Sequence, residues 1–134
     1  QWSAEKNAGF TTAETPWMSV NPNYTWLNTA QQEADPDSIL NFYRKAIALR
    51  KELSCVRHGN YVEYNKLSSS LYTYSREDDK QKLLVVCSYT EKEVPFKAPK
   101  GFDMTSGELI LRNYTRVDAA LLKPYEVRVY LWKK

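Results

Sequence analysis

The spacing of hydrophobic residues divides the chain into three stretches, and the middle one has the period of an α-helix. It runs from Asp35 to Leu53, and its apolar residues cover an arc of roughly 180°, wider than the single stripe of most surface helices. Asp35 is predicted to cap the first turn, Pro36 suits the first helical position, and Asp37 adds negative charge where the helix dipole favours it. We therefore expect one helix with a well-defined N-terminus, which packs against two other parts of the protein.

Arg50 falls inside this apolar arc. A charge that packs among apolar side chains needs a partner. A structural ion pair or a bond to a backbone carbonyl is the interpretation we prefer over a clamp for an anionic ligand.

The first 34 residues show no sustained period and are rich in Asn, Thr, Pro and aromatic residues. An irregular segment longer than ~15 residues inside a compact domain is usually functional or disordered. Large apolar side chains argue against disorder here; they are Phe10, Trp17, Tyr24 and Trp26. We expect a long loop that has a function or packs on a further part of the protein.

The stretch after the turn His58-Gly59-Asn60 changes to the period of two that is typical of β-strands. Six segments are strand-like: 61–64, 70–76, 83–89, 93–96, 108–112 and 125–132. The apolar run from Leu83 to Cys87 predicts a central strand covered on both faces, and Pro95 predicts an edge or a bulge. The fold class is therefore mainly β: a long N-terminal loop and one α-helix, followed by an antiparallel β-sandwich.

Composition narrows the class of protein. The 134 residues suit about one domain, and 43% hydrophobic and 13% aromatic residues predict a folded protein. A net charge of +3 without a basic block disfavours nucleic acid, and no apolar run predicts a membrane span or an export signal. We expect a cytoplasmic protein, and, because Gln1-Trp2 lacks an initiator Met, an excised fragment.

Most residues that could carry chemistry have a simpler explanation. Cys55 and Cys87 lack a repeated spacing and are interpreted as buried apolar residues, so neither a metal site nor a cofactor is predicted. His58 has no nucleophile in a recognisable setting beside it. The pair Asp35 and Asp37 is explained by the helix start, and Asp78-Asp79 by a solvated turn. Aromatic residues of the opening loop could stack on sugar rings, but packing explains them as well.

The whole chain resembles the C-terminal part of α-glucosidases of the α-amylase superfamily, such as oligo-1,6-glucosidases and trehalose-6-phosphate hydrolases. The motifs that carry the resemblance are Gln1-Trp2, Asn7-Ala8-Gly9-Phe10, Thr15-Pro16-Trp17, Val20-Asn21-Pro22-Asn23-Tyr24, Asn28, Asp35-Pro36-Asp37-Ser38, Leu49-Arg50-Lys51, Asn113-Tyr114 and Leu122-Lys123-Pro124-Tyr125-Glu126. In that family a (β/α)₈ barrel carries the active site and an all-β domain follows. The resemblance implies that residues 1–57 are the last barrel loop and the eighth helix, and that residues 58–134 are the C-terminal β-sandwich.

The resemblance also implies an activity for the parent protein. Family members hydrolyse α-glucosidic bonds with retention, using an Asp nucleophile, a Glu acid/base and a further Asp, all on earlier barrel strands. No residue of this chain corresponds to them, so we expect a glycoside hydrolase of short oligosaccharides whose C-terminal part is inactive alone. The loop after the eighth strand lies at the catalytic face, and the residues expected near the substrate are Gln1, Trp2, Asn7 and Phe10.

Two other classes of function remain open. One is a carbohydrate-binding β-sandwich without catalysis, which would carry an aromatic strip on an exposed sheet face. The other is a catalytically dead relative, like the barrel-containing heavy subunits of amino-acid transporters. Whichever holds, the helix face that would pack on a barrel needs a cover in this chain, so we expect either a homodimer through that face or an opening loop folded over it.

Overall fold

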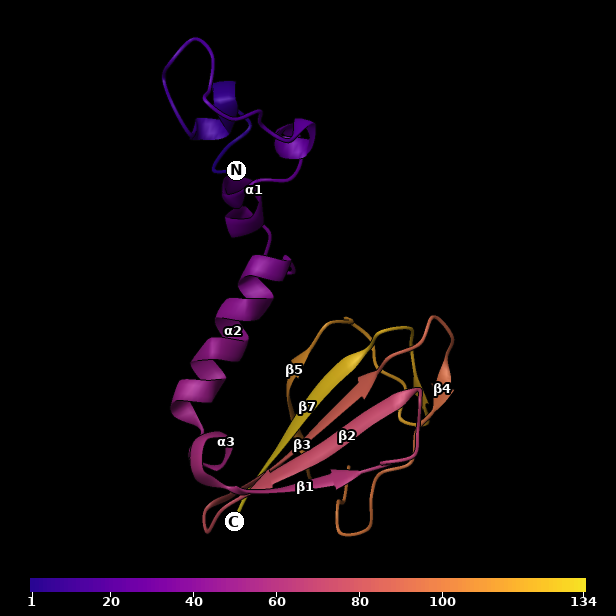
Figure 1. Cartoon of the computed structure of the whole chain (residues 1–134). Helices are drawn as coiled ribbons and strands as arrows, with labels where there is room; N and C mark the ends of the chain where they lie inside the picture. Colours follow the sequence, from indigo (N-terminus) through magenta and orange to yellow (C-terminus); the bar gives the residue numbers. More distant parts are fainter. The chain divides into compact units, whose positions relative to one another are not determined.

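The computed structural model describes residues 1–134, which form two compact units, Gln1–Ala46 and Ile47–Lys134. The first unit is mainly irregular (Figure 1). It contains two 3₁₀ turns, η1 (Lys6–Gly9) and η2 (Pro22–Thr25), the short helix α1 (Thr29–Ala34) and the first part of helix α2 (Ile39–Glu52).

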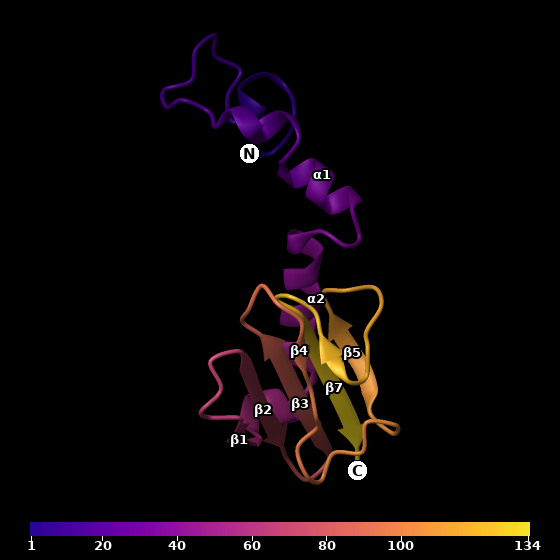
Figure 2. The same ribbon diagram turned by 90° about the vertical axis from the view of Figure 1, so that its right-hand side faces the viewer.

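The second unit begins with the last turns of α2 and helix α3 (Ser54–His58) and is otherwise made of strands. The strands are β1 (Asn60–Tyr64), β2 (Leu71–Glu77), β3 (Gln81–Ser88), β4 (Val94–Pro95), β5 (Glu108–Arg112), β6 (Leu121–Leu122) and β7 (Val127–Lys133). Five of them form an antiparallel sheet in the order β1-β2-β3-β7-β5, and β4 pairs with β6 in a second antiparallel sheet (Figure 2). The mainly β fold class is confirmed.

Strand β3 lies at the centre of the large sheet, between β2 and β7. Leu83, Leu84, Val85 and Val86 are all at most 8% exposed, so both faces of this strand are covered. An unbroken apolar run is what such a position requires, because successive side chains point to opposite faces. The predicted central strand is confirmed, and Pro95 lies at an edge as predicted, since β4 pairs with β6 alone.

Each face of the large sheet carries its own hydrophobic core. On one face Leu83, Val85, Val129 and Leu131 pack with Leu53 and Cys55 from the helical segment. On the other face Leu84, Val86 and Tyr130 pack with Phe96, Phe102 and Leu122, which come from β6 and from the segments that follow β4. The sheet therefore has a helical cover on one side and a small β-layer on the other. Cys55 is buried and Cys87 half-buried, as expected of apolar packing.

The predicted start of the long helix is wrong by three residues: the first helical residue is Ile39 and not Pro36. Asp35 ends α1 as its C-cap, and its carboxylate accepts a bond from the Asp37 backbone N–H in the turn that follows. Helix α2 begins at Ile39, and the Ser38 hydroxyl accepts a bond from the Asn41 N–H at 3.2 Å. Ser38 therefore does the capping that the sequence suggested for Asp35, because a turn intervenes between the two helices.

Three short elements were not predicted: α1, α3 and β6. Helix α2 ends at Glu52, one residue before the predicted end at Leu53; the Leu53 backbone is extended (φ −85°, ψ 114°), and α3 begins at Ser54. None of the helices is long and apolar enough to cross a lipid bilayer.

Candidate functional site

The loop that the sequence places near a substrate is organised around an unusual turn. Asn7, Ala8 and Gly9 are all in the left-handed region, with φ values of 57°, 54° and 76°. A left-handed non-glycine residue costs about 1–2 kcal/mol, so the surrounding contacts must hold this conformation. Ala8 is completely buried, and its carbonyl accepts bonds from the N–H groups of Trp2 at 2.9 Å and Ser3 at 3.3 Å.

The Asn7 side chain locks the outer part of the same turn. Its amide donates to the carbonyls of Thr11 at 3.2 Å and Ala13 at 2.8 Å. Gly9 packs so closely on the start of the chain that an added Cβ would lie 3.2 Å from the Trp2 Cβ. The structure therefore brings three of the four predicted site residues, Trp2, Asn7 and Phe10, to one turn. Asn7 serves there as an internal brace.

Gln1 points toward a different segment of the unit. Its carbonyl accepts from the N–H of Thr29 at 2.9 Å and from the hydroxyl of the same residue at 3.0 Å, and its side-chain amide donates to the Leu27 carbonyl. Gln1 lines an open pocket of about 290 Å³ together with Leu27, Asn28, Thr29, Gln32 and Leu40. Gln1 therefore contacts the start of helix α1 and not the turn that contains Asn7.

Asn28 is the pocket residue that sequence reasoning did not place at the site. It is 4% exposed, caps α1 by accepting from the Gln31 N–H at 3.0 Å, and donates to the Tyr24 carbonyl at 2.8 Å. The Gln31 side chain returns a bond by accepting from the Asn28 amide at 2.9 Å. The spacing Asn28-x-x-Gln31 resembles a capping box, and this signal could have revealed both α1 and the pocket.

The unit exposes an unusual amount of aromatic surface. Trp17 is 98% exposed, Trp26 68%, Trp2 59% and Phe10 55%. Rings held on a braced loop but left open to solvent are suited to contact a ligand or a further part of the protein, because burial of such rings stabilises a complex.

No reaction can be assigned to this arrangement by itself. A retaining glycosidase needs two carboxyl groups roughly 5 Å apart across the bond to be cleaved. The pocket beside Gln1 is lined by no carboxylate, and no cluster of three or more His, Cys, Asp or Glu side chains that could hold a metal is present. The pocket beside Gln1 therefore offers no carboxylate for acid/base or nucleophilic chemistry.

The two residues predicted to have structural roles differ in their surroundings. Asp35 bonds the Asp37 N–H, and its own carbonyl accepts from the Asn41 side chain at 2.7 Å. Arg50 is exposed, and no ion pair in the chain involves it. Its position in the apolar arc of α2 is therefore on the solvent side in this chain.

The buried ion pair of the molecule lies elsewhere, in the sheet unit. Glu126 and Arg128 are 0% and 1% exposed and form two bonds, of 2.8 and 2.9 Å. Arg128 also donates to the carbonyls of Asp118 and Leu121, and Glu126 accepts from the Lys123 N–H. Burial opposes ionisation of Glu126, but the bonds from Arg128 and Lys123 outweigh it and lower the pKa of the carboxyl. The pair holds the β6 segment against β7.

Comparisons with known proteins agree with this architecture. Residues 1–59 match the α-amylase catalytic domain family. The chain is 40% identical over its full length to a probable oligo-1,6-glucosidase 2 of Bacillus subtilis (strain 168), and 35% identical over 99% of its length to a trehalose-6-phosphate hydrolase of Escherichia coli (strain K12). It covers 24% of each, so the chain spans about a quarter of the length of the curated relatives it matches.

Solved structures show the same fold. The trehalose-6-phosphate hydrolase of Bacillus licheniformis superimposes on 100% of this chain with a TM-score of 0.88 at 35% identity, and the match covers 25% of that structure. The trehalulose synthase of Pseudomonas mesoacidophila MX-45 matches 98% of this chain with a TM-score of 0.85 at 32% identity, and the match covers 24% of that structure.

The helical segment within the matched residues, followed by an antiparallel β-domain, has the fold of the C-terminal part of these enzymes. Residues 1–59 match the α-amylase catalytic domain family, and over its whole length the chain is similar to the C-terminal part of α-glucosidases; its homologues are oligo-1,6-glucosidases and trehalose-6-phosphate hydrolases.

Proposed function

We propose that this chain is the C-terminal part of a retaining α-glucosidase that hydrolyses short oligosaccharides in the manner of an oligo-1,6-glucosidase. The observation that carries the proposal is the braced loop of residues 1–34. It lies within the segment that matches the α-amylase catalytic domain, and it presents exposed aromatic rings beside a left-handed turn that backbone and Asn7 side-chain hydrogen bonds hold. Strain held by surrounding contacts is typical of functional loops.

The loop would form one rim of the substrate site. Trp2 and Phe10 offer apolar ring faces for a sugar, while Asn7 maintains the turn that presents them. Gln1, at the end of the last barrel strand, anchors the other side of the loop to α1. The names of the similar enzymes include hydrolases and a synthase, so this part of the fold supports more than one reaction on sugars and leaves linkage selectivity to other loops.

The β-domain would contribute stability. Its two cores and its buried ion pair are complete within residues 47–134, as expected of a unit that folds around its own sheet. The two thiols, Cys55 and Cys87, are free, and free thiols are usual in reducing compartments. We therefore place the parent enzyme in the cytoplasm.

The catalytic carboxylates would lie on earlier barrel strands, so the chain alone is expected to be inactive. The test is to incubate the purified chain with isomaltose and with a chromogenic α-glucoside and to measure glucose and dye release against buffer. We expect no release above the buffer rate. Release of glucose that scales with the concentration of the chain would contradict the proposal that the catalytic carboxylates lie outside this chain.

A further inference from the structure

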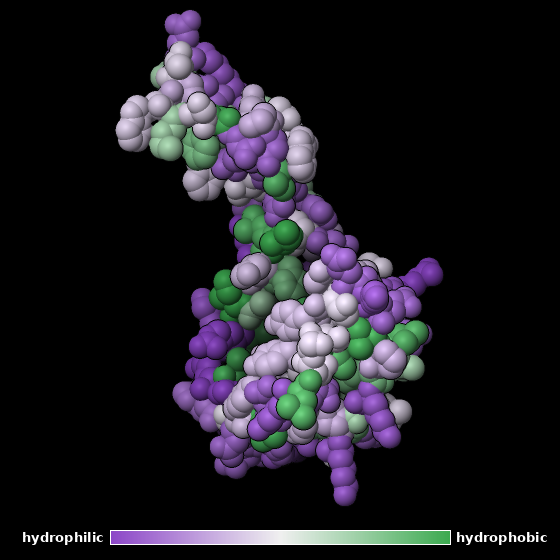
Figure 3. Space-filling view, turned by 45° about the vertical axis from the view of Figure 1, so that its right-hand side comes forward, coloured by the Kyte–Doolittle hydropathy of each residue, from purple (hydrophilic) through white to green (hydrophobic).

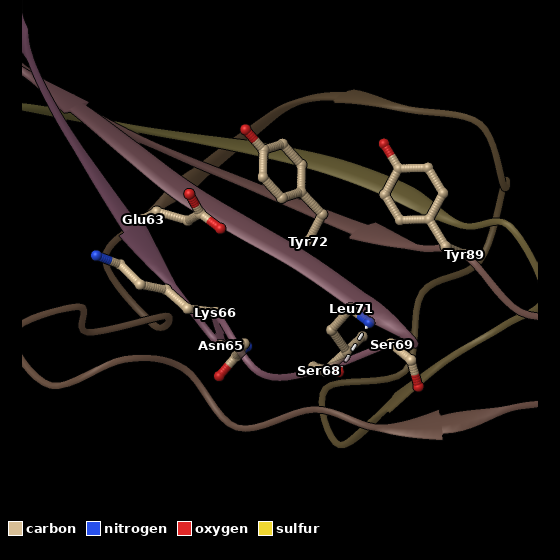
Figure 4. Close-up of a pocket in the computed structure, with 8 residues that line it drawn as sticks. All are labelled: Glu63, Asn65, Lys66, Ser68, Ser69, Leu71, Tyr72 and Tyr89. Carbon is tan, nitrogen blue, oxygen red and sulfur yellow. Dashed lines mark hydrogen bonds between the residues drawn. The ribbon is translucent and has the colours of Figure 1, made fainter.

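The second unit carries a pocket far along the chain from the aromatic loop, and its lining combines tyrosine rings with polar side chains. It has a volume of about 350 Å³ and lies where β1 turns into β2. The lining residues are Glu63, Asn65, Lys66, Ser68, Ser69, Leu71, Tyr72 and Tyr89 (Figure 4). We propose that this pocket, the tyrosine pocket, binds the pyranose ring of a neutral saccharide, as a site separate from the catalytic one.

The aromatic wall is preorganised by contacts among tyrosines. The rings of Tyr72 and Tyr89 have centroids 6.3 Å apart, and Tyr72 is also 5.4 Å from Tyr74. The hydroxyls of Tyr61 and Tyr72 bond each other at 2.9 Å. These contacts fix Tyr72, while Tyr89, at 63% exposed, keeps a ring face open. Stacking on the apolar face of a sugar requires an accessible ring, which Tyr89 supplies, and Tyr72 beside it provides a fixed wall.

The opposite wall supplies hydrogen-bonding groups of both kinds. The Glu63 carboxylate can accept bonds from sugar hydroxyls, and the Lys66 ammonium, which forms no ion pair, can donate. Asn65 has a left-handed backbone (φ 54°), and its side-chain amide donates to the Thr73 hydroxyl at 3.2 Å. Figure 4 shows Lys66 and Asn65 on the side of the pocket away from the two rings, and Glu63 next to Tyr72.

The balance of charge favours a neutral ligand. One carboxylate and one ammonium line the pocket, so neither an anion nor a cation gains from the local field. The same two charges disfavour a dry protein interface, because charged residues are depleted from the centres of such interfaces. A polyhydroxylated ring satisfies both walls, since its hydroxyls pair with the polar side chains and its C–H face lies on the tyrosines.

This inference goes beyond the proposed function, since it concerns a site without catalysis in the other unit. The tyrosine pocket can bind a saccharide even if the parent has a different enzymatic activity. Conversely, the parent can be an α-glucosidase even if the tyrosine pocket binds no saccharide.

The test is a titration of the ¹⁵N-labelled chain with maltose and with isomaltose, followed by amide chemical shifts. An open site that stacks one or two rings should bind with a Kd on the order of 1 mM. We expect saturable shifts of the amides of residues 63–71 and of Tyr89, with no change in tryptophan emission. Every tryptophan lies outside the pocket: Trp2, Trp17 and Trp26 are in the first unit, and Trp132 packs in the core on the opposite face of the sheet.

Matched variants separate stacking from unspecific effects. Tyr89→Ala should weaken binding at least tenfold, whereas Tyr43→Ala, which removes an equally exposed ring (64%) from helix α2, should leave the Kd unchanged. Glu63→Gln keeps the shape of the pocket and should weaken binding about threefold. Sorbitol, an acyclic polyol without a ring face, should cause no saturable shifts.

Three results would overturn the proposal. The first is the absence of saturable shifts in residues 63–71 at 50 times the expected Kd. The second is shifts confined to residues 1–46 with a change in tryptophan emission, which would assign sugar binding to the opening loop. The third is equal binding of sorbitol, or of the Tyr89→Ala variant, which would exclude stacking.

Discussion

At the scale of single residues, the buried pair Glu126–Arg128 is the most consequential feature of the β-domain. Both side chains are completely enclosed, and every polar atom of the guanidinium has a partner in Glu126, Asp118 or Leu121. A buried pair contributes little over an apolar replacement, but removal of one partner leaves an uncompensated charge. Substitutions at one member should therefore be far more harmful than at an exposed pair.

We predict that Glu126→Gln lowers the free energy of unfolding by about 3 kcal/mol. The matched control is Glu77→Gln, which breaks the exposed contact to Lys134 in the same unit and should cost at most about 1 kcal/mol. Urea unfolding followed by circular dichroism measures both. Equal losses for the two variants would contradict the structural importance of the buried pair.

The same pair predicts a pH dependence. The pKa of Glu126 is lower in the folded chain than its usual value of 4.5, so the unfolded state binds its proton first as the pH falls. The stabilisation is complete above the unfolded pKa and is lost as the pH falls through the folded one. Between pH 7 and pH 3 the wild-type chain should lose more unfolding free energy than Glu126→Gln, and parallel losses in urea unfolding would refute this.

Residue patterns predicted some of these local features and missed others for physical reasons. The aromatic residues of the opening loop indicated function or packing, but not that Asn7 and Ala8 would be left-handed, because Ala has no intrinsic preference for that region. The capping role of Asp35 was misassigned since Asp35, Asp37 and Ser38 all suit a cap, and only the fold decides where the helix begins. The partner of Arg128 lies two residues away, so spacing gave no sign of an ion pair.

At the scale of elements, the joint between α3 and β1 depends on Gly59. A Cβ added there would lie 2.5 Å from the carbonyl oxygen of Cys55 and 2.8 Å from that of Glu77, both backbone atoms that cannot yield independently. Gly59→Ala should therefore cost about 2 kcal/mol or more. Gly101→Ala meets only the end of Lys82 at 3.8 Å and should cost about 1 kcal/mol from its positive φ; a reversed order in urea unfolding would contradict this packing.

Strands were predicted better than short helices. Six of the seven strands lie in segments predicted from alternation or from apolar runs: five form the large sheet that carries the two cores, and the two residues of β4 lie inside the predicted segment 93–96. Strand β6 has two residues and helices α1 and α3 have six and five, lengths too short to show a period. These elements are held by tertiary contacts, such as the bond from Ser54 to Asp78, that no local pattern encodes.

Helix α2 leaves a ridge of apolar side chains uncovered. Ile39, Tyr43 and Ile47, four residues apart and therefore on one face, are each more than half exposed, and Figure 3 shows hydrophobic side chains along this helix. Burial of each is worth about 1.5 kcal/mol or more. In the parent protein we propose that other barrel elements cover the ridge, and in this chain that a second copy does.

Sedimentation equilibrium tests the dimer. We predict a concentration-dependent dimer that Tyr43→Lys converts to a monomer, because a charge in the apolar contact is left without a partner. Glu52→Lys, on the other side of the helix, should keep the dimer. A wild-type chain that stays monomeric at all concentrations would remove the homodimer from this account.

At the scale of the whole molecule, the amino-acid sequence predicts the fold better than it predicts the function. Periodicity was sufficient for one helix and an antiparallel sandwich, since burial dictates both patterns. Function could not follow from residues 1–134 by physical reasoning, because no pocket described here joins two carboxylates. It entered through the motif resemblance, which the matches to oligo-1,6-glucosidases and trehalose-6-phosphate hydrolases confirm at the level of the family. The positions of Gln1, Trp2, Asn7 and Phe10 relative to a substrate, and the division at residues 57 and 58, stay predictions.

We propose that this chain supplies the C-terminal quarter and one rim of the substrate site of a glycosidase whose catalytic residues lie in its other parts. The most direct measurement joins the chain to the remaining part of the Bacillus subtilis relative, in place of that protein's own matched segment, and follows hydrolysis of a chromogenic α-glucoside. We predict hydrolysis by the fusion and none by the chain alone. A folded fusion without activity, or activity of the chain by itself, would contradict it.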